Sequence, residues 1–323
     1  MTNCHKKTIF GKRVIAKHFN LRMIKKNKTL QRAKIIFILL TCVNFSFAQQ
    51  LDTLVDVGGY KLHFTIIKGK GTPILFEAGS GNFSTYWDNI SDTVYKLTGT
   101  TLITYDRAGF GKSELNLKDS NLLHHGIENG VADLENGLKK LGYDSDLISV
   151  CHSYGGFYST LFTAKNPKRV KCVVRLDANL VAAYTDENLE KYHSQKVDKS
   201  KGLGMYYETI NFKNTVRLMR QIEFPATVPV FDIIAGVPYH TKTKKQIMEF
   251  EKAHIDFVSG SPNRQLIKAL RCQHDISYDN PELVIAVLIK AFATTLDEKS
   301  KAALLGKTLA YTIEKTNQAK KKH

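Results

Sequence analysis

Residues 147–158 read LISVCHSYGGFY, an apolar run that stops at a polar Cys-His-Ser-Tyr step and a glycine pair. The apolar run predicts a buried strand and the following GGFYSTLFTAKN predicts a helix, so Ser153 occupies the turn between them. An abrupt strand-to-helix turn crowds the backbone, and the residues two before and two after it must be small, as Cys151 and Gly155 are. We therefore expect the turn to lift the Ser153 hydroxyl clear of the sheet.

Apolar runs alternate with helical patterns on both sides of this turn. The strand-like runs are KLHFTII, PILFEAG, TLITYD, DLISVC, VKCVVRLD, VPVFDIIAG and QLIKALRC. Before DLISVC, apolar residues recur at spacings of three and four, which predicts an amphipathic helix containing Ile127, Val131, Leu134, Leu138 and Leu141. Nearly all-apolar strands separated by helices predict an α/β fold, with a mostly parallel sheet covered by helices on both faces.

One connection is too long for a simple crossover helix. Residues 180–225, between VKCVVRLD and VPVFDIIAG, are polar and helix-prone, and we expect a helical cap over one end of the sheet. No repeat or low-complexity linker interrupts residues 49–312, which predicts one domain there. Residues 313–323 lose the apolar period, which predicts a solvated, disordered basic tail.

Three strings resemble motifs of the α/β-hydrolase family. CHSYGG resembles its nucleophile elbow, with Cys151 in place of the usual first glycine. EAGSGNFSTYW resembles its oxyanion loop, with Glu77-Ala78 where many members carry a histidine before the glycine, and YDRAGFGKS resembles the turn after its fourth strand. The resemblance covers about residues 55–292, and it implies the α/β-hydrolase fold of a serine hydrolase or esterase-like member, with the cap inserted between the sixth and seventh strands.

The resemblance also implies roles for individual residues. Ser153 is the expected nucleophile, and His274 in RCQHDISYDN is the expected base, because a serine hydroxyl attacks efficiently only when a base takes its proton. The backbone N–H groups of Tyr154 and Ser80 are the expected donors to the oxyanion of a tetrahedral intermediate.

The acid of the triad is where the chain departs from the family pattern. Many members carry Asp or Glu in the loop after the strand that here reads VPVFDIIAG, but this loop continues VPYHTKTKK without a carboxylate. Asp232 lies within that strand and is expected to point elsewhere. Asp177 ends the preceding strand, where the carboxyl ends of parallel strands border the site, and the order Ser153, Asp177, His274 matches the family. A purely structural role for Asp177 is the alternative.

Several other polar residues are expected to be structural. Asp106 and Arg107 are interpreted as an ion pair or a loop brace, and His152 as a packed side chain of the elbow rather than a second base. No Cys/His pair has zinc-ligand spacing, and no metal site is predicted. Three cysteines are expected to be buried and free: Cys151, Cys172 and Cys272.

The formal net charge of +17 is concentrated at the N-terminus. Residues 1–48 hold 11 Lys/Arg and no acid, so the remainder carries 47 − 11 = 36 basic against 30 acidic residues, or +6. A body with that small excess and no basic stripe argues against nucleic-acid binding.

Residues 23–48 have a basic region, an apolar region and small residues, the pattern of a signal peptide cleaved after Ala48. Residues 1–22 are then a basic extension, which is not translated if Met23 is the initiator. The apolar run of about 14 residues is shorter than the about 20 that span a bilayer. Export to the periplasm or the medium is predicted, and an uncleaved anchor and lipidation of Cys42 are weaker alternatives.

These inferences predict an exported serine hydrolase that cleaves a small-molecule carboxylic ester, or an amide, without a metal or organic cofactor. Contact with a membrane is expected only through an uncleaved signal segment. The alternative is a noncatalytic protein of the same fold that binds a ligand or a partner, and the missing late acid motivates it.

Overall fold

Eight strands form one sheet in the order β1-β2-β4-β3-β5-β6-β7-β8. The computed structural model describes residues 50–193, 199–237 and 243–320, and the predicted signal peptide, its cleavage site and residues 1–22 lie outside these ranges. The strands are β1 Gln50–Asp56, β2 Lys61–Ile67, β3 Ile74–Glu77, β4 Leu102–Tyr105, β5 Leu147–His152, β6 Val170–Leu176, β7 Val230–Ala235 and β8 Arg264–Ala269. β2 pairs antiparallel with β1 and β4, and every other pairing is parallel, so the predicted mostly parallel sheet is confirmed.

Strand β1 was not among the predicted strands. Its residues alternate between exposed and half-buried, with Leu51 and Val55 on the half-buried side. An edge strand buries only one face, so its sequence QLDTLVD mixes polar and apolar residues instead of forming an apolar run. The central strands β3, β4 and β5 are buried throughout, which is why their sequences were recognisable.

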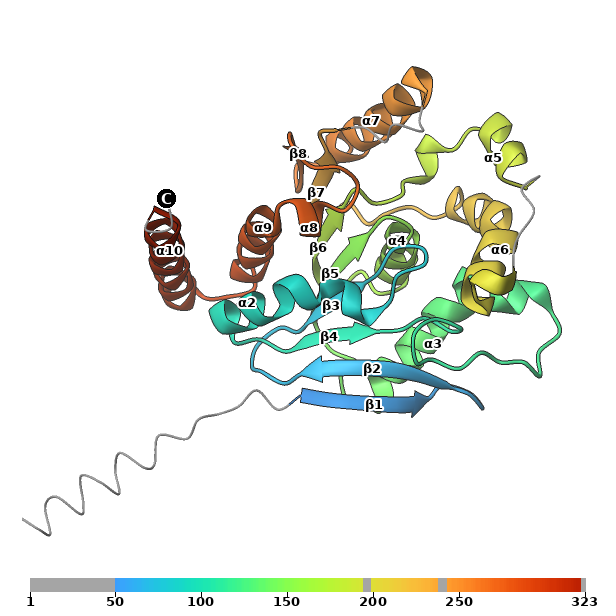
Figure 1. Cartoon of the computed structure of the whole chain (residues 1–323), viewed down its shortest axis with the longest axis horizontal. Helices are drawn as coiled ribbons and strands as arrows, with labels where there is room; N and C mark the ends of the chain where they lie inside the picture. The colour runs from blue at the N-terminus through green and yellow to red at the C-terminus, as the bar shows by residue number, and fades with distance from the viewer. Residues whose placement is uncertain (1–49, 194–198, 238–242, 321–323) are drawn as a thin grey trace, which may run out of the picture. The chain divides into compact units, whose positions relative to one another are not determined.

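Helices cover both faces of the sheet (Figure 1). One apolar cluster joins the sheet to α2 Asp88–Thr98, α9 Pro281–Ala293 and α10 Glu298–Lys320, and the other joins it to α3 Ile127–Lys140 and α4 Gly155–Lys165. Strand β6 serves both clusters, because Cys172 and Val174 belong to the first and Val173 to the second. The remaining helices are η1 Ser84–Trp87, η2 Leu122–His125, η3 Val181–Ala183, α5 Asp186–His193, η4 Lys199–Lys201, α6 Leu203–Met219, α7 Lys244–Ser259 and α8 Ile276–Asp279.

The connection between β6 and β7 is helical, and it contains η3, α5, η4 and α6. Helix α6 touches the loops that follow β3 and β4. The sulfur of Met205 lies 3.3 Å from the hydroxyl oxygen of Ser80, and the N–H of Gly204 donates to the carbonyl oxygen of Gly109 at 3.3 Å. The inserted segment therefore meets the sheet at the carboxyl ends of its parallel strands, where the site was predicted, and its action as a cap over a substrate stays a prediction.

The disordered tail predicted from residue 313 is wrong, because α10 continues to Lys320. Residues 313–320 contain no glycine or proline, and Lys, Gln, Glu and Ala are good helix formers. Leu304 anchors the helix in the first apolar cluster, and the ammonium of Lys307 donates to the carbonyl of Leu97 at 3.1 Å. Local propensity and this docking against α2 extend the helix beyond the point where its apolar period ends.

Candidate active site

Ser153 lies in the turn between β5 and α4, as predicted. Its φ of 51° is in the left-handed region, which is uncommon for a residue other than glycine. A Cβ on Gly155 would lie 2.6 Å from the carbonyl oxygen of Ala78, and one on Gly156 would lie 2.8 Å from that of Asn179. The two glycines therefore let α4 approach the neighbouring loops closely, and this packing holds Ser153 in its strained conformation.

The side chains of Ser153, His274 and Asp177 form one hydrogen-bonded chain. His274 Nε2 lies 2.8 Å from Ser153 Oγ, and His274 Nδ1 lies 2.7 Å from Asp177 Oδ2. Asp177 follows β6 and is 3% exposed, and its other carboxylate oxygen accepts the N–H of Ala235 at 2.9 Å. The carboxylate is thus fixed on two sides, and it can hold one orientation of the imidazole. The catalytic roles of the three residues stay a prediction that this geometry allows.

Asp232 lies in a different place, as expected from its position within β7. Its Oδ2 is 2.6 Å from Nδ1 of His254, and its Oδ1 is 3.4 Å from Nε of Arg175. All three side chains are fully buried. Because Asp232 is held by this cluster, Asp177 is the carboxylate that contacts His274.

The loop after β3 packs directly against the elbow. A Cβ on Gly79 would lie 3.1 Å from Cβ of Ser153 and 2.8 Å from Nδ1 of His152, so only glycine fits there without a shift. Ser80 follows Gly79 in the same loop. Tyr154 immediately precedes α4, and its N–H belongs to the positive end of that helix. These are the two predicted oxyanion donors, and their role stays a prediction.

His152 is a buried side chain of the elbow, as predicted. Its ring stacks on that of Tyr86, with 4.7 Å between centroids and 10° between planes. Burial and the nearby His274 lower the pKa of His152 to about 3, so the ring is neutral at ordinary pH. Sequence reasoning did not foresee that its Nε2 lies 3.0 Å from the backbone oxygen of His274. No local signal could reveal this contact, because 122 residues separate the two positions.

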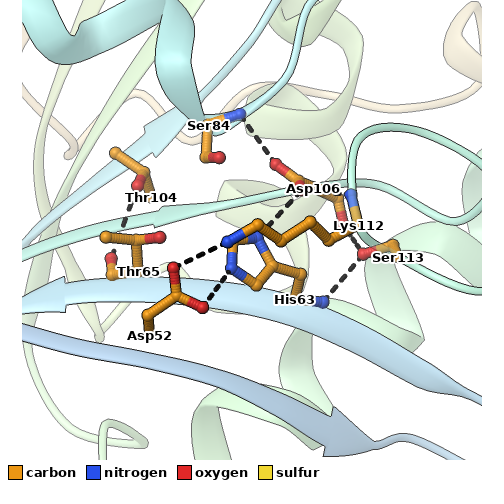
Figure 2. A network of polar contacts seen from close by, with 8 residues as sticks. All are labelled: Asp52, His63, Thr65, Ser84, Thr104, Asp106, Lys112 and Ser113. Atoms are coloured by element: carbon orange, nitrogen blue, oxygen red, sulfur yellow. Dashed lines mark hydrogen bonds and ion pairs between the residues drawn. The ribbon is translucent and has the colours of Figure 1, made fainter.

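Asp106 braces the turn after β4 (Figure 2). Its carboxylate accepts the N–H groups of Ser84 and Lys112, each at 2.8 Å, and lies 2.9 Å from Nδ1 of His63. The other ring nitrogen of His63 is 2.9 Å from a carboxylate oxygen of Asp52. Asp106 therefore ties the turn to β1, β2 and the start of η1, which confirms the interpretation as a loop brace.

Arg107 points into a different cluster, so the alternative of an Asp106–Arg107 ion pair is wrong. Its guanidinium is buried and lies 2.7 Å from Oε1 of Glu77 and 3.1 Å from Oε2 of Glu208, which α6 supplies. The hydroxyl of Tyr105 also donates to Glu77. Burial raises the pKa of both carboxyls, and Arg107 opposes that rise. Glu77 thus belongs to a buried ionic cluster beside the loop that follows β3.

A cavity opens beside His274 on the side of the inserted segment. Its wall contains carboxamides, two aromatic rings and a methyl group: Asn179, Ala183, Tyr184, Asn188, Gln246 and Phe250. Tyr184 also packs edge-on against Phe212 of α6, at 5.2 Å between centroids. Tyr184 therefore lines this cavity and also packs within the inserted segment.

The cysteines are buried and free, as predicted: Cys151, Cys172 and Cys272. Over residues 50–193, 199–237 and 243–320, His, Cys, Asp and Glu side chains form no group of three or more that could hold a metal ion. In the same part of the chain, no helix has both the length and the apolar character needed to cross a membrane.

Comparison with known proteins identifies relatives of this chain. A family model described as the alpha/beta hydrolase fold matches residues 72–212. The uncharacterized protein YqjL of Bacillus subtilis (strain 168) is 28% identical over 239 residues, which cover 72% of this chain and 89% of that protein. The cis-3-alkyl-4-alkyloxetan-2-one decarboxylase of Shewanella oneidensis is 29% identical over 134 residues, which cover 39% of this chain and 41% of the decarboxylase.

Solved structures share the architecture at low sequence identity. A mutant of the Vigna radiata epoxide hydrolase has a TM-score of 0.59 at 15% identity, covering 76% of this chain and 99% of the hydrolase. A thermophilic esterase from Thermogutta terrifontis, with malate bound, has a TM-score of 0.55 at 16% identity, covering 77% of this chain and 99% of the esterase. At these identities the likeness shows the fold alone.

Proposed function

We propose that this chain, which belongs to the α/β-hydrolase fold family, is a serine hydrolase that cleaves a carboxylic ester, or an amide, through an acyl-enzyme. The observation that carries the proposal is the continuous chain of hydrogen bonds from Ser153 Oγ to His274 at 2.8 Å and from His274 to Asp177 at 2.7 Å. A nucleophile, a base and an orienting carboxylate in that order are the requirements for nucleophilic acyl transfer.

In the first half of the proposed reaction, Ser153 Oγ bonds to the substrate carbonyl carbon while His274 Nε2 takes the hydroxyl proton. The carbonyl electron pair moves to oxygen, and the N–H groups of Tyr154 and Ser80 donate to the resulting oxyanion. Asp177 stabilises the imidazolium through Nδ1, where it lies 2.7 Å away. Collapse of the intermediate breaks the bond to the leaving group, which receives the proton from Nε2 and departs.

In the second half, water attacks the acyl-enzyme while His274 takes a proton from it. The second tetrahedral intermediate collapses, the ester bond to Ser153 breaks, and Nε2 returns the proton to Oγ. The carboxylic acid product leaves and the starting state is restored. The proton transfers between Ser153 Oγ and His274 Nε2 join atoms that already lie 2.8 Å apart in the free protein.

Serine at the elbow argues against the epoxide-hydrolase and dehalogenase branches of the family, whose nucleophile is an aspartate. The contact between Asp177 and His274 also weakens the noncatalytic alternative, because that alternative was motivated by the missing late acid. Both observations favour the serine hydrolase over the other activities found on this fold.

We also propose that the protein is exported and acts on a small molecule without binding nucleic acid. The charge of +6 outside residues 1–48 and the basic-apolar-small pattern of residues 23–48 support this. Contact with a membrane is then limited to the signal segment if it stays uncleaved. N-terminal sequencing of protein recovered from the periplasm or the medium should find Gln49 first, and intact protein retained in the cytoplasm contradicts the proposal.

The direct test is hydrolysis of a short-chain and a long-chain p-nitrophenyl ester, together with labelling by a fluorophosphonate probe. We expect the wild-type protein to be active and labelled at Ser153. Ser153→Ala should abolish both signals, and His274→Ala should lower kcat by about 10⁴-fold or more. Ser120→Ala removes an exposed serine and serves as the matched control. A folded wild-type protein that neither hydrolyses the esters nor reacts with the probe overturns the proposal.

A further inference from the structure

Arg107 makes two contacts with the oxyanion loop that the loop-brace interpretation does not explain. Its Nη1 donates to the carbonyl oxygen of Ala78 at 2.6 Å, and its Nη2 donates to that of Gly79 at 2.7 Å. The guanidinium therefore holds two successive peptide groups of the loop that packs against Ser153. The second peptide group joins the C=O of Gly79 to the N–H of Ser80.

We propose that Arg107 is a positioning residue for the oxyanion hole. Arg107 holds the carbonyl of Gly79 and thereby turns the N–H of Ser80 toward the substrate oxygen at Ser153. This inference rests on the proposed serine hydrolase activity. It assigns a function to a residue that touches no reacting atom.

The planarity of the peptide group makes the connection between the two ends direct. The C=O of Gly79 and the N–H of Ser80 belong to one planar trans unit, so they point in opposite directions. Arg107 fixes the direction of the C=O, and the direction of the N–H follows. Gly79 itself lies against the elbow, since a Cβ there would be 3.1 Å from Cβ of Ser153.

A charged donor at the carbonyl also changes the strength of the N–H as a donor. Hydrogen bonds from a cation are stronger than neutral ones, and they polarise the group that accepts them. Electron density drawn toward Gly79 O leaves the Ser80 N–H more positive. The same contact therefore orients the donor and strengthens its hydrogen bond to an oxyanion.

The surroundings of Arg107 hold the guanidinium in one place. Glu77 and Glu208 bind it from two sides, and both carboxyls are buried. Three aromatic rings lie within 5.0–5.7 Å of its central carbon: Phe110, Tyr154 and Tyr158. Glu208 belongs to α6, and Met205 of the same helix has its sulfur 3.3 Å from the side-chain oxygen of Ser80. The inserted segment thus helps to hold the donor loop.

A merely structural Arg107, which only neutralises Glu77 and Glu208, is the alternative. The two roles differ in what they do to kcat and to the Ser80 amide. Arg107→Lys keeps a positive charge, but a single ammonium cannot match the planar fork that spans two carbonyls and two carboxylates. Arg169→Met is the matched control, because Arg169 also donates to two backbone carbonyls, Ser145 at 2.8 Å and Tyr143 at 2.6 Å, away from Ser153.

The experiment measures kcat and KM for p-nitrophenyl acetate and the inhibition constant of a trifluoromethyl ketone, whose adduct with serine carries an oxyanion. For Arg107→Lys we expect kcat to fall about 10²-fold with KM nearly unchanged, because weakening an oxyanion donor acts on the transition state. The inhibition constant should rise by a similar factor. Arg169→Met should leave all three values near those of the wild type.

A spectroscopic measurement separates failure of this inference from failure of the proposed function. In ¹H–¹⁵N spectra of the free protein, the Ser80 amide should shift in Arg107→Lys and stay in place in Arg169→Met. If the wild-type protein hydrolyses no ester, the proposed function fails, and this shift still tests the contact with Gly79. An unshifted Ser80 amide, or a folded Arg107→Lys enzyme with kcat close to wild type, overturns the inference.

Discussion

Nε2 of His152 lies 3.0 Å from the backbone carbonyl oxygen of His274, so the residue before the proposed nucleophile binds the residue proposed to activate it. His152 is also stacked on Tyr86, whose hydroxyl lies 3.3 Å from Oδ1 of Asp275. Two side chains therefore hold consecutive residues of the loop after β8. This loop must keep the imidazole of His274 within reach of Ser153, and these contacts help to hold it there.

Replacing His152 should therefore lower the rate of the chemical step. His152→Phe keeps an aromatic ring over Tyr86 but loses the hydrogen bond to His274, and a bond of this kind contributes about 1 kcal/mol. We expect kcat to fall about 5-fold with KM unchanged. His152→Gln can still donate to the carbonyl and should recover part of the loss. Steady-state kinetics of the wild type, His152→Phe and His152→Gln test this prediction, and unfolding curves verify that each protein is folded. Equal kcat values for all three contradict it.

The buried His152 should also make stability depend on pH. Its pKa is about 3 in the native protein, because of burial and the nearby His274, against 6.5 for an unperturbed histidine. As pH falls below about 6.5, the unfolded chain binds a proton at His152 that the native protein does not bind until about pH 3. The free energy of unfolding should therefore fall with pH in this window, by up to about 1.4 kcal/mol per pH unit from this residue.

The measurement is urea unfolding between about pH 7 and pH 4 for the wild type and His152→Phe. The ionisable side chains facing His152 are those of His274, Asp177 and Asp275, and they are present in both proteins. The difference between the two curves therefore isolates the contribution of His152. Parallel curves across this range would show that His152 is protonated in the native protein or free to leave its site.

Two aspartates on neighbouring strands should respond in opposite ways. Asp177→Asn should lower kcat by about 10³-fold or more, because an amide cannot stabilise the imidazolium of His274. Asp232→Asn should leave kcat per folded molecule unchanged but reduce the free energy of unfolding by about 3 kcal/mol, because it disrupts a buried pair with His254. Kinetics and denaturant unfolding of both variants test this pair. An active Asp177→Asn enzyme would mean that another group orients the base.

The contact between Gly79 and the elbow should make alanine harmful there. Gly79→Ala would place a Cβ 2.8 Å from His152 Nδ1, and the shift needed to relieve this overlap should reduce stability by about 1–3 kcal/mol and lower kcat. Gly306→Ala is the control, since no atom outside the adjoining residues and backbone of α10 lies within 4 Å of its Cβ position. That variant should gain about 0.5–1 kcal/mol of stability from helix propensity and keep its activity. Thermal unfolding and esterase assays of Gly79→Ala and Gly306→Ala measure these effects. A Gly79→Ala protein as stable as the wild type is inconsistent with the close contact between Gly79 and the elbow.

The central part of the fold could be predicted from sequence because its signals are local. Strand β5, the turn at Ser153 and helix α4 are consecutive, and the apolar run, the small residues and the helical pattern all lie within residues 147–166. Strand β1 and the end of α10 were missed for the complementary reason. Strand β1 is an edge strand without an apolar run, and α10 docks through Lys307 against Leu97 of α2, 210 residues away.

The sequence by itself determined the parallel sheet, the serine turn and the positions of the candidate nucleophile and base, because hydrophobic periodicity and turn chemistry act between near neighbours. Only the tertiary structure decided which polar groups meet. Asp177 and His274 are 97 residues apart, and Arg107 and Glu208 are 101 apart. A buried charge must find a partner somewhere, but which partner it finds depends on how the strands and the inserted helices bring distant segments together.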